Sequence, residues 1–180
     1  MTAAPSLVTL LATLAISAGS NAQARPDFSG RWKLDTTIVM GGGRGDALGN
    51  ASGGGGGGGG GTGLGPPAHE LNVEQSDTTI KVAQSGSGDE AILIVYRLDG
   101  KKVRNSMPIG RGRTTEATYV SRWDGSHLLT AIVRTVTARG GGVRLEYRES
   151  RYLASDGSMV VQTNMLGRPA GRTAVYQRLK

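Results

Sequence analysis

Apolar and polar residues alternate along most of the chain with a period of two, which is typical of β-strands that bury one face. Val143, Leu145 and Tyr147, for example, alternate with arginine and glutamate. No stretch after residue 24 shows the period of a helix. The alternation predicts roughly ten strands, at residues 28–34, 70–74, 80–82, 91–98, 101–107, 114–123, 128–137, 143–148, 159–165 and 173–179.

Turn signals separate these strands, and three of the signals are the same dipeptide. Asp99-Gly100, Asp124-Gly125 and Asp156-Gly157 each lie between two apolar-rich runs. Glycine readily adopts the positive φ that a tight hairpin turn needs, so each dipeptide predicts a hairpin between its flanking strands. We therefore predict an all-β fold, an antiparallel up-and-down meander in a closed or nearly closed barrel. Closure removes the exposed edges of a long meander, and a bent open sheet is the alternative.

The first 24 residues are predicted to be a secretory signal peptide. Leu7 to Ala18 form an apolar run too short to span a membrane, and Ala22 and Ala24 provide the small residues of a cleavage site. The mature chain would then begin at Arg25 and form one barrel domain over residues 25–180, with no transmembrane segment. The expected location is the periplasm or the extracellular space.

Glycine dominates residues 40–67, with nine consecutive glycines from Gly53 to Gly61. Such a composition cannot bury apolar surface, so we predict a disordered loop after the first strand. A phosphate-binding loop is the alternative for a glycine-rich segment. It requires a following Gly-Lys-Ser or Gly-Lys-Thr and a helix, and this sequence has neither.

The chain contains no cysteine, which excludes disulfides, thiolate zinc sites and a cysteine nucleophile. Its two histidines, His69 and His127, show no spacing that pairs them with a nucleophile, so we predict no catalytic residue, metal site or cofactor. The net charge of +7 is spread over many arginines and favours an anionic surface partner in general. Nucleic acid is not expected, because the Arg-Gly segments at residues 110–113 and 139–142 are isolated turns rather than long repeats.

The first predicted strand places Phe28, Gly30, Trp32 and Leu34 on one face. A Gly-x-Trp at the start of a meander resembles the opening of calycin barrels, the lipocalins and fatty-acid-binding proteins, and of exported bacterial proteins described as lipocalin-like. In lipocalins an arginine near the end of the last strand stacks on this tryptophan and closes the barrel base. The resemblance therefore implies that Arg178 stacks on Trp32, and that Gly30, Trp32 and Arg178 form a structural base.

The resemblance also implies a ligand inside the barrel. Fatty-acid-binding proteins hold the ligand carboxylate with an Arg-x-Tyr on the last strand, and here Ala174 stands in place of the arginine two residues before Tyr176. Arg172 lies two residues earlier on the same face and is expected to substitute. The residues predicted to face an interior ligand are Leu71, Val73, Ile80, Val82, Ile132, Val161, Met165, Arg172 and Tyr176.

Two classes of function are favoured by the sequence, and an enzyme is the third. The first is a non-enzymatic exported protein that binds a small apolar or amphipathic ligand inside the barrel. The second is an envelope structural or interaction protein whose arginine-rich exterior holds an anionic partner. The interior separates the two, because an empty volume above about 300 Å³ favours a ligand and a packed interior favours the surface role.

Overall fold

The computed structural model describes residues 25–40, 66–85, 91–110, 113–138, 141–168 and 171–180. The predicted signal peptide and most of the predicted glycine-rich loop, residues 41–65, lie outside these ranges. Within them the chain forms ten β-strands, and no helix there is long and apolar enough to cross a membrane. The strands are β1 (Gly30–Met40), β2 (Glu70–Gln75), β3 (Thr79–Ser85), β4 (Ala91–Arg97), β5 (Val103–Gly110), β6 (Arg113–Asp124), β7 (His127–Ala138), β8 (Gly141–Leu153), β9 (Met159–Met165) and β10 (Gly171–Arg178).

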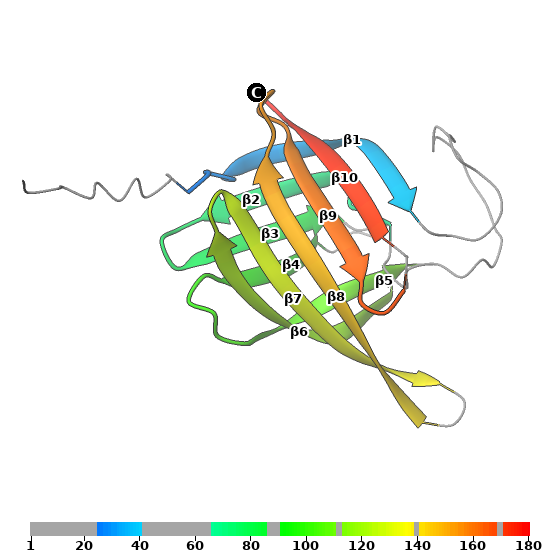
Figure 1. Ribbon diagram of the computed structural model, residues 1–180. Coiled ribbons are helices and arrows are strands. Elements are labelled where there is room, and N and C mark those ends of the chain that lie inside the picture. The colour runs from blue at the N-terminus through cyan, green and yellow to red at the C-terminus, as the bar shows by residue number, and fades with distance from the viewer. Residues whose placement is uncertain (1–24, 41–65, 86–90, 111–112, 139–140, 169–170) are drawn as a thin grey trace, which may run out of the picture.

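The ten strands form one antiparallel sheet that curves into a nearly closed barrel (Figure 1). The strand order from one edge to the other is β4-β3-β2-β1-β10-β9-β8-β7-β6-β5. The first and last strands pair with each other, and every other pair joins strands that are consecutive in sequence. The predicted all-β meander is therefore confirmed, and its architecture is compatible with a calycin-like barrel. β4 and β5 remain as the two edges of the sheet.

Two of the Asp-Gly turns join paired strands, as predicted. Gly125, with φ 57°, lies in the tight turn between β6 and β7. Gly157, with φ 82°, lies between β8 and β9, where Asp156 Oδ1 accepts hydrogen bonds from the Ser158 backbone N–H and hydroxyl. Both glycines thus supply a backbone conformation that other residues adopt only with strain.

The hairpin predicted at Asp99-Gly100 is wrong. Gly100 does adopt a positive φ of 74°, and the Asp99 carboxylate accepts a hydrogen bond of 3.1 Å from the Lys101 backbone N–H. A hydrogen bond from Arg97 also reaches this carboxylate and lowers the pKa of Asp99 to about 2. The local turn therefore forms, but β4 and β5 leave it without pairing. An Asp-Gly dipeptide specifies a turn and does not by itself specify pairing of the strands beyond it.

β1 differs from the predicted first strand at both ends. It begins at Gly30 rather than Phe28, and it continues to Met40, beyond the predicted end at Leu34. The added residues pair with β10 after a register shift between Leu34 and Thr36. Because a shift of register changes which residues face inward, the alternation that begins at Phe28 does not continue past Leu34.

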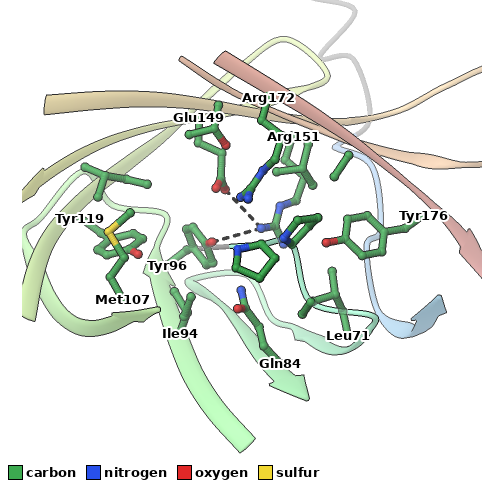
Figure 2. Close-up of a pocket in the computed structure, with 17 residues that line it drawn as sticks. Leu71, Gln84, Ile94, Tyr96, Met107, Tyr119, Glu149, Arg151, Arg172 and Tyr176 are labelled. Carbon is green, nitrogen blue, oxygen red and sulfur yellow. Dashed lines mark hydrogen bonds and ion pairs between the residues drawn. The ribbon is translucent and has the colours of Figure 1, made fainter. Parts of the chain in front are cut away.

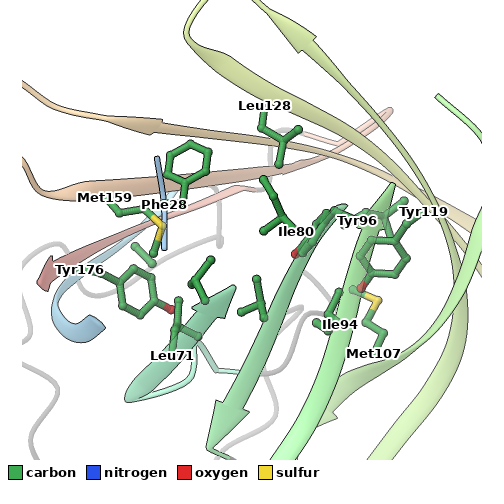
Figure 3. Packing of buried hydrophobic residues seen from close by; sticks show 14 of the residues in the cluster. Phe28, Leu71, Ile80, Ile94, Tyr96, Met107, Tyr119, Leu128, Met159 and Tyr176 are labelled. Atoms are coloured by element: carbon green, nitrogen blue, oxygen red, sulfur yellow. The ribbon is translucent and has the colours of Figure 1, made fainter. Parts of the chain in front are cut away.

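Buried hydrophobic side chains from every strand form one continuous core inside the barrel (Figure 3). Trp32, Ile80 and Leu128 are completely enclosed, and the neighbouring Val73 and Val82 are also buried. Removal of this apolar surface from water is the main favourable contribution to the stability of such a domain. The core leaves little empty space, so any interior site is confined to where the packing is incomplete.

The segment before β1 closes one end of the barrel. The Trp32 indole N–H donates to the Phe28 carbonyl at 2.8 Å, and the Phe28 ring stacks on Trp123 with centroids 5.8 Å apart. Arg178 is the strand partner of Trp32, and its guanidinium carbon lies 4.6 Å from the centroid of the Trp32 ring. Arg178 also donates a hydrogen bond of 3.0 Å to the Asp27 carbonyl. Arg178 of β10 thus stacks on Trp32 of β1, as the calycin resemblance implied.

Gly30 lies directly beside this base. Its φ is +121°, and a Cβ added to it would lie 3.5 Å from Arg178 Nη1. We expect Gly30→Ala to lower the free energy of unfolding by about 1–3 kcal/mol, because an L-residue is strained at this φ. Urea denaturation measures the change. A loss below about 0.5 kcal/mol, the range of ordinary surface substitutions, would show that the backbone relaxes at this position without strain.

Candidate functional site

Inward-facing side chains of the described strands line a small cavity of about 60 Å³ (Figure 2). A water molecule needs about 10–15 Å³ by this measure, so the cavity holds about four to six water-sized groups. It is much smaller than the roughly 300 Å³ of a pocket for a drug-sized ligand. The lining residues are Pro66, Pro67, Ala68, Leu71, Gln84, Ile94, Tyr96, Met107, Tyr119, Ile132, Glu149, Arg151, Val161, Thr163, Arg172, Ala174 and Tyr176.

The structure brings together part of the predicted interior set at this cavity. The predicted residues that line it are Leu71, Ile132, Val161, Arg172 and Tyr176. Those that are buried in the core without lining it are Val73, Ile80, Val82 and Met165. Alternation along a strand predicts which side chains face inward, but it does not predict at which level of the barrel the packing leaves a space.

Arg151 is the most unusual group of the cavity. It lies on β8 and is only 2% exposed. One guanidinium nitrogen, Nη2, donates to the Tyr96 hydroxyl at 3.1 Å and to Glu149 Oε1 at 3.2 Å (Figure 2). The Nε and Nη1 atoms of Arg151 are buried and have no hydrogen-bond partner among the described residues. Since buried polar groups in proteins are nearly always hydrogen-bonded, this half-satisfied cation calls for an explanation.

The charge of Arg151 is maintained in spite of its burial. Burial opposes the charged form, but the nearby Tyr96 and Glu149 outweigh this effect and raise the pKa of Arg151 above its ordinary value. Burial is also the main cause that raises the pKa of Tyr96, so that its hydroxyl stays protonated at neutral pH. The cavity therefore contains a permanent buried cation.

The other polar groups of the cavity also favour a negatively charged ligand. Figure 2 shows that Arg172 and Tyr176 of β10 reach the same space as Arg151. Burial raises the pKa of Tyr176 to about 12, so its hydroxyl can donate a hydrogen bond at neutral pH. Two arginines and the single carboxylate of Glu149 line the cavity, which gives a formal net charge of one positive unit. The site therefore complements a single negative charge.

Glu149 and Arg151 were missed by the sequence analysis, although β8 contained the signal. The predicted strand ended at Arg148, whereas β8 continues to Leu153. Extending the alternation from Tyr147 places Glu149 and Arg151 on the same inward face. Charged residues on the apolar face of a strand are the signal that would have identified this site.

The two histidines do not contribute to the cavity. His127 Nδ1 lies 3.1 Å from the Ser150 hydroxyl, and its ring stacks on Tyr152 with centroids 4.5 Å apart. These residues alternate with the buried Leu128 and Arg151 and so lie on the outer face of the barrel wall. Among the residues that the structure describes, no three histidine, aspartate or glutamate side chains gather as metal ligands.

No protein-family model matches the chain, and no curated protein sequence matches it significantly. The arrangement of residues around the cavity is therefore the basis for a functional conclusion.

Proposed function

We propose that the protein is an exported calycin-like barrel that binds a small amphipathic anion and catalyses no reaction. The observation that supports this most strongly is the buried guanidinium of Arg151, two of whose nitrogens lack a partner among the described residues. A buried donor without a partner costs about 1–3 kcal/mol, and more when it is charged. The Nε–H and Nη1–H bonds point to different edges of the guanidinium, so a ligand carboxylate can accept a charge-assisted hydrogen bond from one of them. Ligand binding would thus remove part of the penalty.

The charges of the cavity favour a monoanion. Arg151 and Arg172 provide two positive charges, and Glu149 offsets one of them. The Tyr176 hydroxyl provides a further neutral donor for a carboxylate oxygen. A dianion would leave an unbalanced negative charge beside Glu149, which is costly at low dielectric.

The size and the apolar wall of the cavity favour a short carboxylic acid. Room for about four to six water-sized groups matches acids of about two to four carbons. Met107, Ile132 and Val161 provide apolar contacts for the alkyl part of such a ligand. Methionine is flexible, so Met107 is the lining residue best suited to move aside for a longer tail.

The packed interior also favours the second candidate, an anionic partner on the exterior. However, three exterior arginines pair with glutamates, which reduces the field that an anionic partner would experience there. These pairs are Arg31 with Glu70, Arg104 with Glu116 and Arg144 with Glu146. The cavity, where two nitrogens of the buried Arg151 have no hydrogen-bond partner among the described residues, is therefore the better supported site.

Calorimetric titration with a series of carboxylates from acetate to octanoate tests the proposal. We expect binding with an optimum near propanoate or butanoate, because longer chains must displace packed side chains. The alcohol of the same chain length is the matched neutral control and is expected to bind at least about tenfold more weakly, since it cannot satisfy the buried cation. Equal binding of acid and alcohol, or no binding of any acid, would rule out the proposed anion site.

A further inference from the structure

The barrel closes without a backbone ladder where β4 faces β5. These strands are the two edges of the sheet, and no backbone ladder joins them in the described chain. We call this boundary the β4–β5 seam, defined by Ala91–Arg97 on one side and Val103–Gly110 on the other. Elsewhere neighbouring strands are joined by ladders of backbone pairs, although residues 113–117 of β6 pair with β5 alone and residues 134–138 of β7 pair with β8 alone. β1 and β8 likewise extend beyond their neighbours.

Among the described residues, one side chain makes hydrogen bonds across the seam. The Asn105 amide Nδ2 donates to the Val95 carbonyl at 2.8 Å, and Asn105 Oδ1 accepts from the Val95 backbone N–H at 2.9 Å. The side-chain amide thus supplies the donor and acceptor that a backbone peptide group of a paired strand would supply. Asn105 is 7% exposed, so water does not readily replace these two hydrogen bonds. Breaking these two hydrogen bonds costs less free energy than breaking all the backbone hydrogen bonds of a complete ladder.

The cavity lies immediately behind the seam. Ile94 and Tyr96 on β4 and Met107 on β5 line it from the two sides of the boundary. Tyr96 also packs edge-on against Tyr119 of β6, with ring centroids 5.7 Å apart. Separation of β4 from β5 would therefore expose the cavity wall directly. At the base, by contrast, the Phe28 and Trp32 contacts close the barrel.

We propose that the ligand reaches the cavity through the β4–β5 seam and that the hydrogen bonds between Asn105 and Val95 set the rate of opening. This inference rests on the anion-binding function proposed above. Asn105 does not touch the cavity, so it controls access without contributing to affinity. Its loss should accelerate association and dissociation together and leave the dissociation constant nearly unchanged.

Exchange of butanoate between free and bound states, measured by NMR, tests this inference. Two variants remove the hydrogen bonds in different ways: Asn105→Ala shortens the side chain, and Asn105→Leu keeps its approximate size. We expect both to raise the dissociation rate about tenfold or more, since two hydrogen bonds no longer oppose opening. The dissociation constant should change less than about threefold, because the association and dissociation rates change together. Ser106→Ala, an exposed neighbour on β5, is the matched control and should exchange like the unaltered protein.

The outcomes separate this inference from the proposed function. If butanoate binds but exchanges at the same rate in both Asn105 variants, the ligand uses another route, such as the Pro66–Pro67 side of the cavity, and the seam proposal is wrong. If butanoate does not bind the unaltered protein, the anion-binding function fails and the seam proposal fails with it. A further measurement uses the unaltered protein, so its result does not depend on whether the variants fold. Relaxation dispersion should show microsecond-to-millisecond exchange at the Val95 amide, and its absence contradicts the inference.

Discussion

Replacement of Trp32 by alanine is expected to lower the free energy of unfolding by about 3–5 kcal/mol, as for other large aromatic residues removed from cores. The indole is completely buried, and its N–H is bonded to the Phe28 carbonyl. Arg178→Ala should cost less, about 0.5–1 kcal/mol, because the arginine is exposed and its loss leaves the ring buried. Trp32 is therefore the larger contributor to the barrel base.

Urea denaturation of the two single variants and of the double variant measures these terms. We expect the double variant to lose about 0.5 kcal/mol or more less than the sum of the single losses, because the two side chains touch. Trp123→Phe serves as a background in which emission reports on Trp32 alone. A solvent-exposed emission maximum in that background, or a loss below about 1 kcal/mol in Trp32→Ala, would contradict the described base.

Replacement of Arg151 by methionine is expected to weaken butanoate binding by roughly tenfold or more. A charge-assisted hydrogen bond of about 1.5–3 kcal/mol is lost. Methionine is unbranched and uncharged, so the change removes the cation and retains the packing of the first part of the side chain. Arg148→Met is the matched control, because Arg148 lies on the same strand with its side chain exposed. Calorimetry should show unchanged butanoate affinity in that control.

The same substitution separates a binding role from a structural one. Arg151→Met leaves the largely buried Glu149 without its partner, so the double variant with Glu149→Gln is the informative protein. Replacement of a buried ion pair by uncharged residues is often neutral or stabilising, by about 1–4 kcal/mol. We expect this variant to unfold at the same or a higher urea concentration than the unaltered protein. A loss of several kcal/mol would mean that the guanidinium serves the fold instead of a ligand.

Alternation of side chains was sufficient to predict the strands and the meander, because a half-buried strand leaves a clear pattern in the sequence. The contact between Trp32 and Arg178 was expected from the resemblance to calycin barrels, and the structure contains it. Pairing between the two strands that flank a turn could not be predicted. Asp99-Gly100 has the same composition as the two hairpin turns, and the contact of Asn105 with Val95 depends on a tertiary arrangement that no local pattern encodes.

The site was only partly predictable for a related reason. Arg172 and Tyr176 were expected inside the barrel, and both line the cavity. Arg151 was not expected there, because the predicted strand ended before it. Whether a guanidinium has all its hydrogen bonds satisfied depends on residues from distant strands, such as Tyr96 on β4. This property appears only when the strands are assembled.

A crystal structure of the protein with bound butanoate is the most direct measurement of the central claim. The account predicts that a carboxylate oxygen lies within about 3.2 Å of Arg151 Nε or Nη1, with the alkyl chain against Ile132 and Val161. Butanoate elsewhere on the protein, or a cavity that stays closed to it at saturating concentration, would contradict the account.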